Sequence, residues 1–327
     1  MKNKYGFAIL VLGIFGGCST RVLLPPVLEH TMVLMDGSGK SIPTLDALVK
    51  RTEGSDVVFV GEIHNDSLTH VVELELARRM AKQNSRLGIA MEMFERDAQK
   101  VLNGYLEGQI PEAEFLRKSK PPSNYGTDYR PLIEFARESR LTVIAMNVPR
   151  RIANRVAMGG EGVLASLPDS EKVWVAGELK PLDDEYKKRF LDEMGGERPG
   201  PMAKLDPENL YKAQVLKDDT MAESIREFLL SHRGGNVLSI VGDFHSAYGL
   251  GVVKKIRLMA PSVRTSIVSI VPVENIETLD FKANQGRGDY IVFVRRLKAE
   301  KTGNPSKPSE GSVPAKPGDA AKPRGGG

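Results

Sequence analysis

Apolar residues fall into short runs that recur along the chain and predict strands. The runs are rich in β-branched residues and carry few charges, as expected for strands that are covered on both faces of a sheet. The predicted strands are Val57–Val60, Leu87–Met93, Thr142–Met146, Val173–Ala176, Asn236–Val241, Thr265–Val271 and Tyr290–Val294.

Amphipathic segments lie between these runs, with apolar residues at helical spacing. The predicted helices are Leu68–Lys82, Ile133–Arg140, Met221–Ser231 and Val252–Ala260. Strands that alternate with helices favour an α/β fold. We therefore expect a mainly parallel sheet with helices on both faces.

Two charge-rich segments do not fit this alternation. Asp97–Ser119 and Pro181–Gln214 have helical patterns and contain no convincing strand. We expect these insertions, at about 97–119 and 181–214, to pack together as a small helical subdomain or cap. The α/β domain that carries them is predicted to span residues 31–296.

The two ends of the chain differ from this folded part. Residues 297–327 are rich in Lys, Pro and Gly, with almost no large apolar residue, and so predict a disordered tail. At the start, Lys2 and Lys4 precede the apolar run Phe7–Gly16, which is too short to span a membrane. This pattern predicts a signal peptide over residues 1–17.

Cys18 is the one cysteine of the chain, which excludes an intramolecular disulfide. Its position after Gly16 and Gly17 resembles a bacterial lipobox, in which the cysteine is acylated and becomes the first mature residue. The resemblance implies a lipidated tether at 18–30 that holds the protein to a membrane. With Ser19 next, it also implies sorting to the cell outer membrane. The alternative is a plain signal peptide with an incidental cysteine.

Charge and common motifs remove several function classes. The formal net charge of +4 is small for 327 residues, and no block of basic residues alternates with aromatic ones. Both observations argue against a dedicated nucleic-acid-binding protein. The sequence also lacks a HExxH helix, a GxSxG turn, a P-loop and the Rossmann glycine pattern.

One short motif occurs twice, each time directly after a predicted strand. Gly61-Glu62-Ile63-His64 follows Val57–Val60, and Gly242-Asp243-Phe244-His245 follows Asn236–Val241. Ligands of parallel sheets bind beyond the carboxyl ends of the strands, and glycine permits a sharp turn there. Glu92, near the end of another apolar run, needs a partner if it is buried. Arg150 follows a fourth strand and suits a carboxylate or phosphate.

These residues leave two readings open. Glu62, His64, Glu92 and His245 have the donor types of a divalent-metal hydrolase, with zinc or manganese activating a water. A histidine–glutamate pair acting as a general base is a related possibility. The alternative is a purely structural role, in which each histidine forms hydrogen bonds within the fold and Glu92 caps a helix.

The ordered set of motifs resembles the superfamily that joins ChaN haem-binding proteins, erythromycin esterases and the TraB and Tiki proteases. The segments most similar to ChaN are Gly61-Glu62-Ile63-His64, Glu92-Met93-Phe94, Asn147-Val148-Pro149-Arg150, Ala213-Gln214 with Asp218–Ala222, Gly242-Asp243-Phe244-His245, and Gly249–Gly251. The similarity runs from about Val57 to Ile256. It implies a haem-binding lipoprotein for iron uptake. It also implies a dimer in which two haems stack face to face, each iron held by a tyrosine with a histidine contributing through water.

The resemblance does not identify the tyrosine. Tyr186 is the first candidate, because Lys187, Lys188 and Arg189 offer cations for haem propionates and for a tyrosinate. Its competitors are Tyr125, Tyr129, Tyr211 and Tyr248. The cofactor site is accordingly predicted to include Tyr186, His64, His245 and Arg150.

Overall fold

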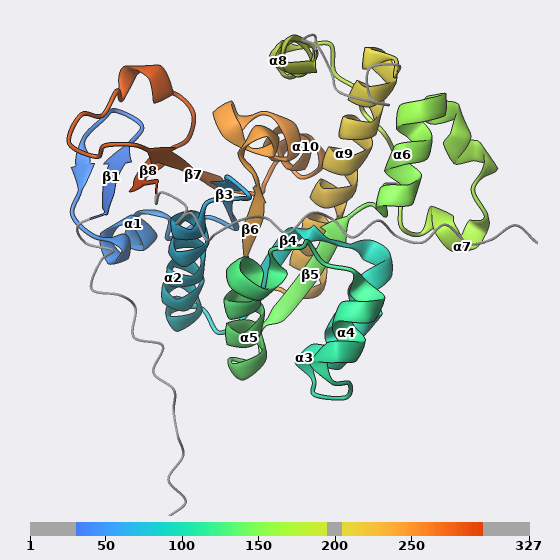
Figure 1. The fold of residues 1–327 in the computed structure, drawn as a ribbon, viewed down its shortest axis with the longest axis horizontal. Helices are drawn as coiled ribbons and strands as arrows, with labels where there is room; N and C mark the ends of the chain where they lie inside the picture. The colour runs from blue at the N-terminus through green and yellow to red at the C-terminus, as the bar shows by residue number, and fades with distance from the viewer. Residues whose placement is uncertain (1–30, 195–204, 297–327) are drawn as a thin grey trace, which may run out of the picture. The chain divides into compact units, whose positions relative to one another are not determined.

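The centre of the molecule is an eight-stranded sheet in which β3 and its neighbours are parallel. The computed structural model describes residues 31–194 and 205–296. The strand order is β2-β1-β8-β7-β3-β6-β4-β5, and most of this order can be followed across Figure 1. The strands are β1 (Met32–Asp36), β2 (Ser41–Ile42), β3 (Val57–Glu62), β4 (Leu87–Glu95), β5 (Thr142–Asn147), β6 (Asn236–Gly242), β7 (Thr265–Val273) and β8 (Tyr290–Arg295).

The predicted α/β fold with a mainly parallel sheet is confirmed, and six of the predicted runs form β3 to β8. Sequence reasoning missed β1 and β2. Strand β1 pairs antiparallel with β8 and with the two-residue β2, so this edge is the antiparallel part of the sheet. Its residues are partly exposed and mixed in polarity, which gives a weaker pattern than the buried strands.

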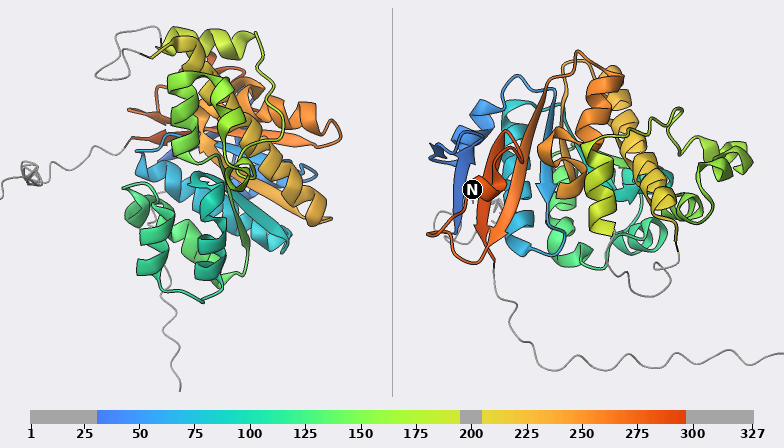
Figure 2. Two further views of the ribbon diagram at one scale, coloured as in Figure 1. Left: turned by 90° about the vertical axis from the view of Figure 1, so that its right-hand side faces the viewer. Right: turned by 90° about the horizontal axis from the view of Figure 1, so that it is seen from above.

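Helices cover both faces of the sheet. The first face carries α1 (Leu45–Arg51), α2 (Ser67–Gln83), α3 (Gln99–Leu106), α4 (Glu112–Ser119) and α5 (Arg130–Glu138), whose apolar residues share one core with the strands. The opposite face carries α9 (Pro207–Ser231) and α10 (Gly251–Met259) over a second core. Figure 2 shows α9 running beside the sheet next to α10.

A third hydrophobic cluster lies at the amino-terminal half of α9. It joins α6 (Arg150–Gly159), α8 (Glu185–Met194) and the segment that contains α7 (Asp169–Lys172). The helix α9 is continuous from the third cluster to the second, because Pro207 and the capping carboxylate of Asp206 fix its start and no break follows. Among the described residues of the two charge-rich insertions, α3 and α4 belong to the first core and α8 belongs to the third cluster.

The strand predicted at Val173–Ala176 is wrong. These residues follow α7 in turns, where Trp174 N donates to Glu171 O and Val175 N to Lys172 O. Val173 is 69% exposed, while Trp174 packs on the third cluster and under the Arg151 guanidinium, 4.9 Å from its ring centroid. A run of four apolar residues cannot by itself separate a strand from a loop that packs apolar side chains on neighbouring helices.

The predicted signal peptide at 1–17, Cys18 with its tether at 18–30, and the tail at 297–327 lie outside the described residues. Within 31–194 and 205–296, every helix is too short or too polar to cross a bilayer.

Candidate functional site

The carboxyl ends of β3, β6 and β4 lie side by side and bring the repeated motifs together. Glu62 ends β3 and is paired in register with Gly242, which ends β6. The Glu92 side chain of β4 reaches this point, where its Oε2 accepts the Gly242 amide at 2.7 Å. His64 and His245 therefore lie on either side of one carboxylate at one edge of the sheet.

The two glycines are required by close approach and not by an unusual turn, because neither has a positive φ. A Cβ at Gly242 would lie 3.0 Å from His64 Nε2 and 3.5 Å from Glu92 Oε2. A Cβ at Gly61 would lie 2.7 Å from an oxygen of Asp243. Glycine at both positions lets the strand ends carry polar side chains in contact with the backbone.

His245 is held between two buried carboxylates. Its Nδ1 lies 2.5 Å from Asp218 Oδ1, and its Nε2 lies 3.3 Å from Glu92 Oε1. Burial alone would lower the pKa of His245, but Glu92 and Asp218 raise this pKa to about 10. Burial acts on Glu92 in the opposite sense, yet His245, His64 and the Gly242 amide hold the pKa of Glu92 well below its usual range. At neutral pH, His245 is thus an imidazolium that lies between the carboxylates of Glu92 and Asp218.

His64 is the exposed member of the cluster, with half of its side chain accessible. Its Nδ1 bonds Glu62 Oε1, which also accepts the Tyr129 hydroxyl at 2.7 Å. The hydrogen bond with Glu62 raises the pKa of His64 above its ordinary value, against the effect of burial. Because Glu62 engages Nδ1, the second nitrogen is the one directed toward Gly242 and Glu92.

A crevice of about 430 Å³ opens at these strand ends. His64, Glu92 and the predicted Arg150 line it, together with Asn147 and Lys217. Arg150 lies at the start of α6, its side chain is 79% exposed, and its nearest anion, Glu95, is 4.0 Å away. The crevice is therefore lined by the imidazole of His64 and the carboxylate of Glu92, and the cations of Arg150 and Lys217 could bind an anionic group of a ligand.

The predicted metal set does not form one ligand cluster. In the part of the chain that the structure describes, the metal-ligating side chains whose donor atoms all lie within 4.8 Å are Glu62, His70 and Glu73. Glu62, His64, Glu92 and His245 instead divide into the pair of His64 with Glu62 and the pair of His245 with Glu92.

Tyr186 of α8 is buried, and its hydroxyl donates to Asp218 Oδ2 at 2.7 Å. Burial and the Asp218 carboxylate raise the pKa of Tyr186 well above its ordinary value. The expectation that neighbouring cations favour its tyrosinate form is therefore wrong. Two of the neighbouring cations also have carboxylate partners, Lys187 with Glu208 and Arg189 with Glu185, and the Arg189 guanidinium lies over the ring of Tyr248. Tyr186 instead donates a hydrogen bond to Asp218, the carboxylate that pairs with His245.

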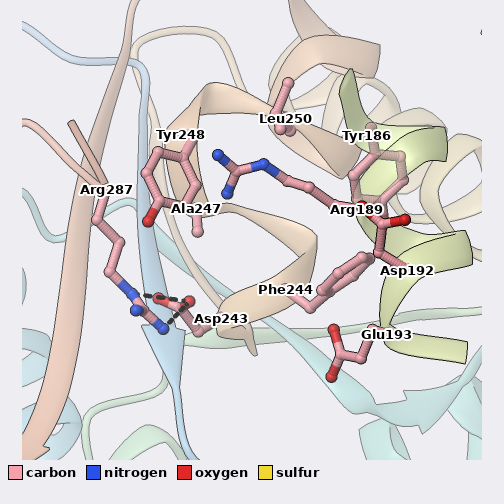
Figure 3. A pocket seen from close by; sticks show the side chains of 10 residues that line it. All are labelled: Tyr186, Arg189, Asp192, Glu193, Asp243, Phe244, Ala247, Tyr248, Leu250 and Arg287. Atoms are coloured by element: carbon pink, nitrogen blue, oxygen red, sulfur yellow. Dashed lines mark hydrogen bonds and ion pairs between the residues drawn. The ribbon is translucent and has the colours of Figure 1, made fainter. Parts of the chain in front are cut away.

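A second pocket, of about 330 Å³, lies between α8 and the loop that follows β6 (Figure 3). Phe244, Ala247 and Leu250 supply its apolar wall. Tyr248 lies between two guanidinium groups: Arg189 sits 3.8 Å from its ring centroid, and Arg287 pairs with Asp243 at 2.7 Å. Tyr248 has a φ of 62°, which is uncommon for a residue other than glycine and is often found at functional sites.

The sequence analysis gave no site role to the helix residues that support these groups, although Gln214 and Asp218 lie in a stretch that resembles ChaN. Asp218 and Gln214 are buried polar residues one turn apart on α9, and His70 and Glu73 have the same relation on α2. The available signal was a polar residue on the inner face of an apolar helix. The spacing alone does not tell which strand end such a residue faces.

Comparison with known proteins agrees with this architecture. Residues 48–256 match the family described as haem-binding uptake, Tiki superfamily, ChaN. The chain belongs to this family. The matched region runs from within α1 to within α10 and includes the lining residues of both pockets except Arg287.

The individual proteins to which the chain is similar are distant in sequence. ChaN of Campylobacter jejuni, a structure titled for cofacial haem binding, has 18% identity and a TM-score of 0.57 and covers 81% of this chain and 97% of its own. A variant of the erythromycin esterase EreC has 13% identity and a TM-score of 0.45, covering 79% and 81%. Protein RETICULATA-RELATED 5, chloroplastic, of Arabidopsis thaliana is 24% identical over 59% of this chain, which spans only 28% of that protein.

Proposed function

We propose that this protein binds haem in the second pocket, with Tyr248 as the iron ligand. Membership of a haem-binding family supports haem as the ligand. The choice of pocket rests on how far each candidate tyrosine is buried. Tyr125, Tyr129, Tyr186 and Tyr211 are buried, whereas Tyr248 is half-buried and lines a pocket.

The buried tyrosines are poor ligands in this structure. The hydroxyls of Tyr129, Tyr186 and Tyr211 donate to Glu62, Asp218 and Leu182 O. Burial raises the pKa of Tyr125 and of Tyr211, which opposes the anionic form that ferric iron prefers.

The other walls of the second pocket suit a porphyrin. Phe244 and Leu250 offer apolar contact to the ring, and Arg189 and Arg287 offer positive charge to its propionates. The volume of about 330 Å³ is at the lower end for ligand sites, so a haem would lie partly outside. The exposed ring face is then free to stack on a second haem, which supports a homodimer.

The test is titration of the full chain with haemin, followed by the absorbance band near about 400 nm that haem proteins share. Tyr248→Phe is expected to shift this band and to weaken binding at least about tenfold, because it removes the anionic ligand. Tyr290→Phe is the matched control, since Tyr290 is also half-buried but bonds Arg51 O outside the pocket. If His64→Ala loses haemin binding while Tyr248→Phe binds haemin as the wild type does, the haem site is the crevice and not the second pocket.

We also propose that the protein is a lipid-anchored component of the cell outer membrane that takes part in haem and iron uptake. The support is the apolar leader followed by Cys18 and Ser19, combined with the family's described role in uptake. Labelling with a radioactive fatty acid should mark the wild-type chain and not Cys18→Ser. An abundance that does not change with iron supply would count against the uptake role.

A second candidate function is hydrolysis at the crevice, favoured by the two imidazole–carboxylate pairs that flank Glu92. His64 is accessible and positioned by Glu62, as a general base requires. Glu92→Gln should then abolish cleavage of ester or peptide substrates, while Tyr248→Phe should leave it unchanged. Cleavage that persists in Glu92→Gln would refute this activity.

A further inference from the structure

A buried cluster of ionisable side chains lies behind the crevice, between β3 and α2. Glu62 ends β3, and His70 and Glu73 face it from adjacent positions on the inner side of α2. Their side chains are 0%, 3% and 1% exposed. His70 Nδ1 lies 3.1 Å from Glu73 Oε2 and 3.6 Å from Glu62 Oε2.

Two carboxylate oxygens in this cluster lack a hydrogen-bond donor. Glu62 Oε2 and Glu73 Oε1 are fully buried and unpartnered among the described residues. In the same part of the chain, neither carboxylate forms an ion pair with a lysine or an arginine. Glu62 has the His64 imidazole on its other oxygen, but two carboxylates buried side by side are costly unless a proton or a metal ion lies between their unpartnered oxygens.

The second nitrogen of His70 shows which atom is free for that species. His70 Nε2 lies 3.1 Å from the carbonyl oxygen of His64, which can only accept a hydrogen bond. Nε2, which also lies 3.7 Å from Asp128 Oδ2, is therefore the nitrogen that donates, and Nδ1, within hydrogen-bond distance of Glu73 Oε2, is the nitrogen that faces Glu62 and Glu73. A histidine that donates one nitrogen to a carbonyl and turns the other to a cation is the usual arrangement of a metal ligand.

We propose that Glu62, His70 and Glu73 bind a divalent transition-metal ion in a buried site. One imidazole nitrogen and two carboxylates are donors suited to zinc or manganese. The three donor atoms already lie within 4.8 Å of one another. Tyr129 and His64 bond the other oxygen of Glu62 and hold that ligand in place.

This site differs from the predicted metal set, with which it shares only Glu62. It is also independent of the proposed haem pocket, which contains none of its three ligands. Glu62 is both a proposed ligand of the ion and the hydrogen-bond partner of His64, so an ion at the buried site would help to fix the position of His64 in the crevice. Its charge would offset the two carboxylates and favour the folded chain.

The experiment loads the full chain separately with Zn²⁺ and Mn²⁺, removes excess ion by gel filtration, and measures metal content and the midpoint of thermal unfolding. The wild type should retain about one ion per chain, and Glu73→Gln and His70→Gln should each retain less than about a tenth. Added chelator should lower the midpoint of the wild type but not that of the variants. Haem is measured separately by its absorbance, so iron does not enter the count.

Glu75→Gln is the matched control, because Glu75 is a buried glutamate of the same helix that pairs with Arg78 and Arg79. It should retain the ion even if its unfolding midpoint falls. His232→Gln controls for the loss of a histidine, since His232 stacks on Phe228 far along the chain. A wild type that retains neither ion overturns the proposal and leaves a proton shared by Glu62 and Glu73. Full retention in Glu73→Gln overturns it as well.

Discussion

Asp218 is the residue on which the strand-end cluster most depends, and Asp218→Asn tests this directly. The side chain is fully buried, lies 2.5 Å from His245 Nδ1 and accepts the Tyr186 hydroxyl at 2.7 Å. Asparagine keeps the shape of the side chain and removes its charge. The imidazolium of His245 then has a single anion, Glu92, at 3.3 Å.

The cost can be worked from the contacts. Removing one partner of a buried ion pair costs about 3–5 kcal/mol. Glu92 remains beside His245, and the imidazole can lose its proton, so the lower part of that range applies. We expect Asp218→Asn to lower the free energy of unfolding by about 3 kcal/mol and to lower the pKa of His245 from its value of about 10.

Urea unfolding followed by the fluorescence of Trp174, the single tryptophan, measures the first quantity. Titration of the imidazole by nuclear magnetic resonance measures the second. Asp169→Asn is the matched control, because Asp169 pairs with Lys172 at an exposed site and should leave the unfolding midpoint unchanged. A loss below about 1 kcal/mol, with an unchanged His245 titration, would refute the buried ion pair.

Three further predictions follow from other contacts. Folding raises the pKa of His245 and lowers that of Glu92, so the contribution of this pair to the free energy of unfolding is complete between about pH 4.5 and 6.5. This contribution declines by up to about 1.4 kcal/mol per pH unit as the pH rises toward 10, and it is also lost in acid. A urea-unfolding free energy that stays constant from pH 7 to 10 would contradict this. Gly88→Ala should destabilise by about 1–3 kcal/mol, because its Cβ would lie 2.5 Å from the buried Phe228 ring, whereas Gly126→Ala, with open space around it, should have little effect on the same urea midpoint. Gln99→Ala should speed hydrogen exchange at the Ala145 amide, which now donates to the Gln99 side chain at 2.7 Å, and unchanged protection relative to Gln109→Ala would show that this bond is unimportant.

The buried strands were predictable because each is a continuous apolar run with nothing to contradict it. The antiparallel edge was not, since β1 and β2 are short and partly exposed, β2 pairs with β1, and β1 pairs with β8 far along the sequence. Val173–Ala176 failed for the opposite reason: an apolar run there packs on helices through Trp174 and Val175.

The convergence of His64, Glu92 and His245 could be inferred from strand ends alone, because parallel strands place their carboxyl ends at one edge. The charges that tune these groups could not. Asp218 reaches His245 because α9 packs beside the end of β6, and the spacing of polar residues along α9 does not show this contact. Burial and the same Asp218 carboxylate raise the pKa of Tyr186. Tyr248 was one candidate among several until burial separated it from the others.

The side-chain amide of Gln99 has a further consequence for how copies of this chain can associate. Strand β5 is an outer strand, and its outward-facing Val143 carbonyl and Ala145 amide are both bonded to Gln99, as a neighbouring strand would bond them. At the other border, β2 offers only two residues to an incoming partner. Both borders thus resist growth of the sheet into a second molecule. In the part of the chain that the structure describes, association through helices, loops or bound ligands is therefore favoured over pairing of edge strands.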